Sequence, residues 1–187
     1  MELDQLLERG TESMGRIIAG VRQEQFDNPT PCSEWSVRDL LNHVIGGNHF
    51  FAAIAAGERP DTTGPARDVV GDDPATAYAQ GAKAALEAWR APGTAERIVH
   101  MPMGDMPGAF GMGLHFIDHL VHSWDLAKAT GQESLADPDL AEAALGLVKG
   151  NVGEELRQPG GPFGPEVPCA DDAAPFDRLV AYLGRQP

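Results

Sequence analysis

Residues 115–125 concentrate side chains that can bind a cation or transfer a proton, in the order His-Phe-Ile-Asp-His-Leu-Val-His-Ser-Trp-Asp. The segment contains three of the six histidines of the chain and two aspartates. If it is helical, at about 100° per residue, steps of three and four residues put four of these side chains on one face: His115, Asp118, His122 and Asp125. Such a face is either a polar surface or half of a metal site.

The spacing of Asp118 and His122 suits a cation, because residues four apart in a helix have Cβ atoms about 6 Å from each other. Two ligands at this spacing can bind one ion, as the two histidines of a zincin helix do. His119 lies about 60° from the His122 direction and reaches such a site only from the flank. Asp125, one turn below His122, is expected to hold a neighbouring group. An Asp-x-x-x-His pair is also common on a solvated helix face, so spacing alone leaves both interpretations open.

A tight catalytic site needs a third protein ligand. Outside the segment the remaining histidines are His43, His49 and His100. We select His43, because its predicted helix face is otherwise apolar and is expected to point at another helix, with Gly47, Phe50 and Ile54. His49 lies nearer the polar side, and His100 lies in a segment of ambiguous structure.

The spacing of apolar residues predicts helices over residues 2–22, 36–56, 73–91, 107–130, 137–156 and 173–184. Ser36 and Asp39 form a capping-box pattern, with Asp in place of the usual Glu. Asp-Pro pairs at 73–74 and 137–138 combine an N-cap with proline at the first helical position. Gly131 is a plausible left-handed cap at the end of the motif helix.

The organisation predicted from these elements is an all-α bundle, because strand signals are few. Only residues 94–106 alternate weakly, which is compatible with a short extended segment. Residues 158–168 are rich in proline and glycine and are predicted to form an irregular strap. We expect residues 1–157 to form the bundle that carries the site. Residues 158–187, the strap and the last helix, are expected to pack on it within the same domain.

Composition restricts the classes of partner. The chain of 187 residues suits one domain, and its net charge of −14 argues against nucleic acid, because phosphate contacts need clustered Lys and Arg. No apolar run approaches the roughly 20 residues of a membrane helix, and the first residues lack the pattern of a signal peptide. We therefore expect a cytoplasmic protein in which Cys32 and Cys169 are free thiols. A helical bundle is compatible with a homodimer, but no apolar stripe indicates one.

Three sequence blocks resemble a known family. The first is Thr-Pro-Cys-Ser-Glu-Trp-Ser-Val-Arg-Asp-Leu at residues 30–40, followed by His43. The second runs from Asp118 through His122-Ser-Trp-Asp-Leu-Ala to Gly131, and the third from Phe163-Gly-Pro to Gly-Arg-Gln-Pro at residues 184–187. Together, and in this order, they resemble DinB-like proteins, in particular the actinobacterial branch related to the metal-binding domain of mycothiol-dependent maleylpyruvate isomerase.

The resemblance implies a DinB-like four-helix bundle with additional short C-terminal helices and one divalent metal ion. Matching motif to motif gives His43, Asp118 and His122 as the ligands. The isomerase carries Glu where this chain has Asp118, so the metal here would lie closer to the motif helix or bind less tightly. Other DinB-like proteins use three histidines, so His115 or His119 remains a substitute ligand or a support.

The resemblance also implies a chemistry. Zn²⁺ is the expected ion, with Ni²⁺ or Fe²⁺ as alternatives, and the metal would activate a low-molecular-weight thiol such as mycothiol in a transferase or isomerase-like reaction. The substrate would be a small molecule or a thiol adduct. Cys32 is expected to pack before a helix start, although a helix N-terminus can lower a thiol pKa and a reactive role stays open. The alternatives are a metal-dependent hydrolase that uses water, and a metal- or small-molecule-binding protein without catalysis.

Overall fold

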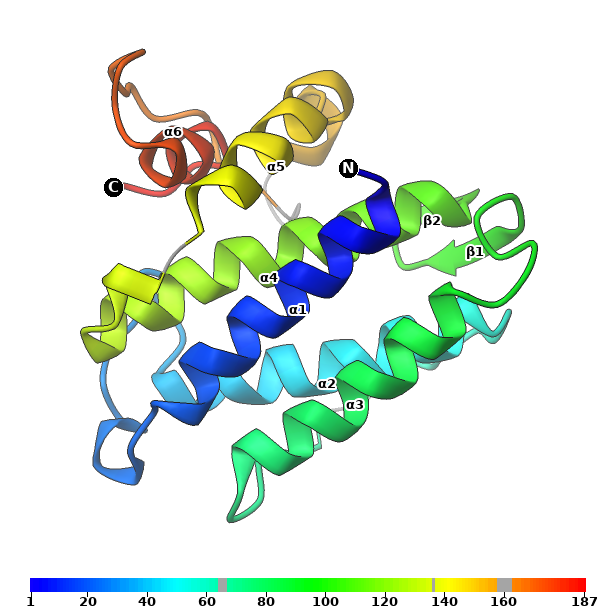
Figure 1. The fold of residues 1–187 in the computed structure, drawn as a ribbon, viewed down its shortest axis with the longest axis horizontal. Helices are drawn as coiled ribbons and strands as arrows, with labels where there is room; N and C mark the ends of the chain where they lie inside the picture. The colour runs from blue at the N-terminus through cyan, green and yellow to red at the C-terminus, as the bar shows by residue number, and fades with distance from the viewer. Residues whose placement is uncertain (64–66, 136, 158–162) are drawn as a thin grey trace.

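The structure is a computed structural model that describes residues 1–63, 67–135, 137–157 and 163–187. These residues form six α-helices and one two-stranded sheet (Figure 1), namely α1 (Leu3–Ala19), α2 (Val37–Ala55), α3 (Pro74–Trp89), β1 (Ile98–Met101), β2 (Gly104–Pro107), α4 (Gly108–Thr130), α5 (Pro138–Asn151) and α6 (Pro175–Tyr182). Short 3-10 helices lie at η1 (Gln23–Gln25), η2 (Glu133–Leu135) and η3 (Glu154–Arg157). The predicted all-α fold class is confirmed.

Helices α1 to α4 form the four-helix bundle (Figure 1). Helix α2 packs along α3 and α1 along α4, and contacts of α1 with α3 and of α2 with α4 close the arrangement. Leu7 and Phe116 belong to one part of the core, which continues to α5 and α6. Met14 and Leu41 belong to the other part, between α1, α2, α3 and the C-terminal half of α4. Each such fully buried side chain stabilises the fold by about 1.5–3 kcal/mol.

Side-chain caps confirm three of the predicted helix starts. The Ser36 hydroxyl accepts a hydrogen bond from the Asp39 N–H at 3.2 Å, and the Asp39 carboxylate accepts one from the Ser36 N–H at 3.0 Å. The carboxylates of Asp73 and Asp137 accept from N–H groups in the first turns of α3 and α5. Gly131 ends α4 with φ of 74°, in the left-handed region that favours glycine. The start of α2 and the end of α4 are thereby fixed.

A β-hairpin replaces the single extended segment predicted between α3 and α4. Strand β1 pairs antiparallel with β2, with Ile98 opposite Pro107. The second strand escaped prediction because Gly and Pro have low strand propensity and carry no alternating pattern. Gly108 then starts α4 in close contact with the segment between α3 and β1, where an added Cβ would collide with the Thr94 carbonyl.

The C-terminal helices pack on one side of the bundle (Figure 1). Helix α5 ends at Asn151, earlier than the predicted residue 156, because Val152 leaves the helical conformation and Gly150 and Gly153 disfavour it. Helix α6 lies against α5 and buries Phe176 and neighbouring apolar residues in the same core. Residues 158–162 of the predicted strap lie outside the described residues. No helix among the described residues is long and apolar enough to cross a membrane.

Candidate metal centre

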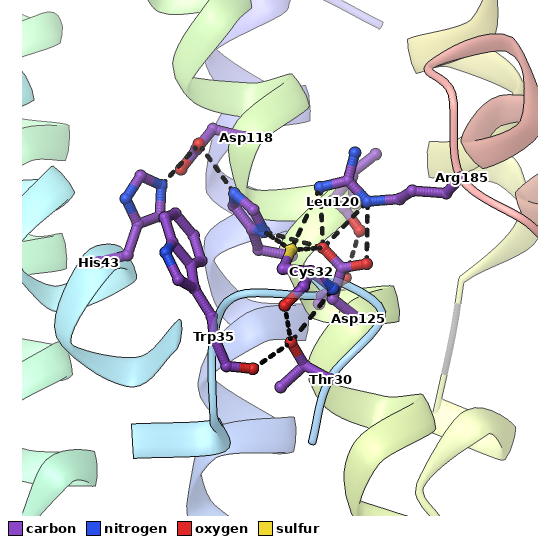
Figure 2. A network of polar contacts seen from close by, with 10 residues as sticks. Thr30, Cys32, Trp35, His43, Asp118, Leu120, Asp125 and Arg185 are labelled. Carbon is purple, nitrogen blue, oxygen red and sulfur yellow. Dashed lines mark hydrogen bonds and ion pairs between the residues drawn. The ribbon is translucent and has the colours of Figure 1, made fainter. Parts of the chain in front are cut away.

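Three side chains from two helices converge at one point of the bundle. His43 belongs to α2, while Asp118 and His122 lie one turn apart on α4. His43 Nε2 lies 3.2 Å from Asp118 Oδ1, and His122 Nε2 lies 3.5 Å from the same oxygen. Potential ligand atoms of the three residues all lie within 4.8 Å of one another. Figure 2 shows His43 and Asp118 facing each other between α2 and α4.

These separations fit a single cation. Around a tetrahedral ion with bonds of about 2.0–2.1 Å to nitrogen and oxygen, neighbouring ligand atoms lie about 3.3 Å apart. The two distances to Asp118 Oδ1, 3.2 and 3.5 Å, bracket that value. Two imidazole nitrogens and one carboxylate oxygen also form a donor set that suits Zn²⁺, Ni²⁺ or Fe²⁺. The short side chain of Asp118 therefore reaches a position between the two imidazoles.

The electrostatics of the group keep the carboxylate ionised. Burial raises the pKa of Asp118, but the His122 and His43 rings outweigh it, so this pKa lies well below its usual range. Burial likewise opposes charge on His43, yet the adjacent Asp118 carboxylate outweighs it and raises the pKa of His43. Asp118 is consequently in the form that binds cations at neutral pH.

A cavity of about 410 Å³ gives access to the group, and it is lined by residues 32–35, His43, Asp118, His122 and Arg185. The His43 side chain is 37% exposed and that of Asp118 is 24% exposed, so both face this space. The Trp35 ring forms one wall, with its centroid 4.7 Å from that of His43 and 5.8 Å from that of His122. The volume lies within the usual range of small-molecule sites.

The segment between η1 and α2 brings Cys32 and Trp35 to the cavity. The Thr30 hydroxyl donates to the Trp35 carbonyl at 2.8 Å and accepts from the Cys32 N–H at 3.1 Å, which folds the chain into a tight loop. Pro29 and Ser36 bridge the base of this loop. The side-chain amide of Asn28 donates to the Ala129 carbonyl near the end of α4 and fixes the loop against that helix.

Asp125 connects the candidate centre with the C-terminal residues (Figure 2). This carboxylate is fully buried and lies 2.9 Å from His122 Nδ1. Arg185 donates to it from Nε and from the terminal guanidinium, at distances of 2.9–3.1 Å. Burial raises the pKa of Asp125, but the hydrogen bonds from His122 and Arg185 outweigh it and lower this pKa. Asp125 thus contacts both His122 and Arg185.

Cys32 contacts Asp125, His122 and Arg185. Its thiol donates to Asp125 Oδ2 at 3.2 Å and lies 3.9 Å from His122 Nδ1. Burial and the negative charge of Asp125 raise the pKa of the thiol to about 12. Cys32 and Asp125 lie on the same ring nitrogen of His122, so the three residues do not form a nucleophile–base–acid relay. Cys32 is a protonated thiol that contacts the candidate centre.

His115 and His119 point into the bundle core and lie outside the three-residue group. His115 Nδ1 accepts from the Trp89 indole N–H at 3.1 Å, and Nε2 lies 3.2 Å from Asn48 Oδ1. His119 Nδ1 lies 3.1 Å from the carbonyl of His115, and its ring lies beside that of Tyr78. Both nitrogens of His115 are engaged, so this residue has no lone pair left for a metal. His115 and His119 thus belong to the core, whereas His43 and His122 line the cavity.

Two residues of the site had no assigned role in the sequence prediction. Arg185 is 60 residues from Asp125 in sequence, and no local spacing rule connects them. Trp35 lies inside the first sequence block, so the block marked its segment but not its position over His43.

Fold and site together define a DinB-like helical bundle with a candidate metal centre on α2 and α4. The chain belongs to the family described as the mycothiol maleylpyruvate isomerase N-terminal domain, whose model matches residues 7–127. Two uncharacterized proteins from two strains of Mycobacterium tuberculosis are each 40% identical over 178 residues, which cover 95% of this chain and 94% of the relative.

Two solved structures share the fold. The crystal structure of the mycothiol-dependent maleylpyruvate isomerase is 18% identical with a TM-score of 0.68, over 88% of this chain and 75% of that chain. A histidine-to-alanine variant of the isomerase is 17% identical with a TM-score of 0.62, over 78% of this chain and 68% of that chain. At this level of identity the likeness shows a common bundle architecture.

Proposed function

We propose that this chain binds one divalent metal ion through His43, Asp118 and His122 and uses it to activate a low-molecular-weight thiol, with mycothiol as the expected thiol. The observation that carries the proposal is the convergence of three potential ligand atoms, all within 4.8 Å of one another, beside an open cavity of about 410 Å³. Zn²⁺ is the expected ion, with Ni²⁺ or Fe²⁺ as alternatives.

The charges of the cluster favour an anionic partner. A bound divalent ion would supply a Lewis acid that lowers the pKa of a thiol. Asp118 contributes one negative charge, and the charge of Asp125 is balanced by Arg185. With neutral imidazoles, the loaded centre therefore retains one positive charge that a thiolate neutralises. Trp35 and the loop around it would orient the body of the thiol compound.

The thiol is expected to come from outside the chain. Cys32 is the cysteine at the cavity, and its pKa of about 12 keeps it protonated and hydrogen-bonded to Asp125. It is therefore a poor nucleophile at neutral pH. The family to which the chain belongs, named after a mycothiol-dependent isomerase, supports mycothiol as the external thiol.

Metal analysis of the purified protein tests the first part of the proposal. We expect about one divalent ion per chain, and we expect His122→Ala and His43→Ala to lose it, because two ligands rarely retain a catalytic ion. His100→Ala is the matched control, since His100 lies in the hairpin and pairs with Asp105. Full metal content in both ligand variants would overturn the assignment.

Thiol turnover tests the second part. Metal-loaded protein is incubated with mycothiol and a test electrophile, and disappearance of the free thiol is followed. Turnover that requires the thiol and is lost in His122→Ala supports the proposal. Hydrolysis of test esters or amides without any thiol would overturn it in favour of a metal-dependent hydrolase. Metal binding with neither activity would overturn it in favour of a non-catalytic metal-binding protein.

A further inference from the structure

The hydrogen bonds of Asp125 restrict the state of the His122 ring. An ionised carboxylate accepts hydrogen bonds and cannot donate them. Because Asp125 Oδ2 lies 2.9 Å from His122 Nδ1, this nitrogen carries the proton. In the neutral ring Nε2 then keeps its lone pair, and Nε2 is the atom that lies 3.5 Å from Asp118 Oδ1. The tautomer held by Asp125 is thus the one that a metal ligand requires.

Arg185 in turn compensates the charge of the buried Asp125 carboxylate. Asp125 has no exposed surface, and an unpaired charge in such a position is strongly destabilising. Arg185 contacts both carboxylate oxygens and is itself only 16% exposed. Its terminal guanidinium nitrogen also lies 3.6 Å from Cys32 Sγ, so the same side chain contacts the loop of the cavity.

The position of Arg185 depends on the C-terminal helix. Its backbone N–H donates to the Val180 carbonyl in α6 at 2.8 Å. Phe176, Leu179 and Val180 fix α6 in the core that also contains α5. A continuous set of contacts therefore runs from α6 through Arg185 and Asp125 to His122.

We infer that Asp125 and Arg185 are positioning residues: Arg185, carried by the segment after α6, holds Asp125, and Asp125 holds His122 in the Nδ1–H tautomer that leaves Nε2 free for a metal. The inference deepens the proposed function and rests on it for the metal. It assigns a role in the site to a residue beyond the part of the chain that the family model matches, which ends at residue 127.

Histidine side-chain ¹⁵N NMR of the metal-free protein at about pH 8 reads the tautomer directly. The wild-type His122 ring is expected to carry its proton on Nδ1. Asp125→Asn replaces one acceptor oxygen with an N–H donor, so the proton is expected to move to Nε2. An unchanged Nδ1–H signature in Asp125→Asn would overturn the inference. This readout requires no metal, so it reports the tautomer of His122 independently of the proposed metal binding.

Metal affinity, measured by competition with a chelator, provides the second readout. Loss of a partner behind a ligand weakens metal binding by about 10–100-fold, and we expect this for Asp125→Asn. Arg185→Gln is expected to weaken it about tenfold, although Arg185 contacts none of the three ligand atoms. Arg178→Gln is the matched control, because Arg178 on α6 pairs with Glu142 on α5, away from the cavity. Wild-type affinity in Arg185→Gln, with the control also unchanged, would overturn the role of the C-terminal segment.

Folding and metal content separate the remaining outcomes. If Asp125→Asn fails to fold, Arg185→Gln carries both readouts, because the Asp125 carboxylate stays in place and the glutamine amide can still donate a hydrogen bond to it. A wild-type protein that binds no metal would overturn the proposed function. The tautomer measurement would remain valid in that case. Loss of the Nδ1–H form in either variant would support the inference that Asp125 fixes the tautomer of His122.

Discussion

Acidification should destabilise the metal-free protein through His115, which is buried in the bundle core. Its Nδ1 accepts from Trp89 and its Nε2 lies beside Asn48 Oδ1, so the folded ring is neutral with one proton on Nε2. A second proton would have to enter at Nδ1, against the Trp89 donor. Burial lowers the pKa of His115 well below its usual value, with the neighbouring His119 adding to this effect.

The sign and size of the effect follow from proton uptake. An unfolded histidine has a pKa of about 6.5, so below that pH the unfolded chain binds a proton that the folded His115 does not. The stabilisation is therefore complete above about pH 6.5 and declines as the pH falls, with a slope approaching 1.4 kcal/mol per pH unit for one histidine. Burial also lowers the pKa of His119, so this residue adds to the slope in the same direction.

His43 contributes with the opposite sign in a different window. Its pKa is raised, because the Asp118 carboxylate outweighs the effect of burial. The folded chain therefore retains a proton above pH 6.5 that the unfolded chain has lost, and its stability declines as the pH rises through that region. Below about pH 6.5 His43 is increasingly protonated in both states, so it does not cancel the slope from the buried core histidines.

Urea unfolding followed by tryptophan fluorescence, in the presence of a chelator, measures these slopes. His115→Gln offers an amide oxygen to Trp89 and an N–H to Asn48 but does not titrate, so its slope below pH 6.5 should be smaller by about 1.4 kcal/mol per pH unit. His100→Gln, in the hairpin, controls for loss of a histidine outside the core. If the free energy of unfolding falls equally steeply with pH below about 6.5 in His115→Gln and in the wild type, the reasoning is refuted.

Three further predictions concern local structure and charge. Gly108→Ala should lower the free energy of unfolding by about 1–3 kcal/mol, because its Cβ meets the Thr94 carbonyl; urea midpoints measure this, and an unchanged midpoint would contradict the close approach. Ser36→Ala should cost about 1 kcal/mol by removing the cap of α2, again measured by urea unfolding, whereas a loss below a few tenths would mean that the cap is replaced by water. Asp118→Asn should lower the pKa of His43 in the metal-free protein, since the carboxylate is what raises it. An NMR titration of the His43 ring measures this, and a pKa equal to that of the wild type would refute the assigned cause.

The sequence predicted those parts of the fold that depend on local patterns. Apolar spacing and the caps at Ser36, Asp73 and Asp137 are read within a few residues of each helix start, and each is present in the structure. The β-hairpin was missed in part, because its second strand has neither alternation nor β-branched residues. Strand β2 forms because it pairs with β1 and contacts α4, and not because its residues favour a strand.

The candidate site was predictable to the extent that it lies on one helix. The four-residue step between Asp118 and His122 follows from helix geometry alone, whereas His43 was assigned by resemblance and by its apolar helix face. Helix α4 is buried on nearly every side, so periodicity could not tell that His115 belongs to a core network with Trp89. The contact of Arg185 with Asp125 joins residues far apart in sequence, and only the packed structure defines it.

Anomalous scattering at a metal absorption edge, recorded from crystals of the purified protein, tests the central claim most directly. We expect one strong peak per chain at the edge of zinc or, as alternatives, of nickel or iron. The ion is expected to be bound by His43 Nε2, Asp118 and His122 Nε2. If crystals of metal-loaded protein show no such peak, the proposed metal centre is contradicted. A peak held instead by other residues, such as the Cys32, His122 and Asp125 cluster on the opposite side of the same imidazole, would contradict it equally.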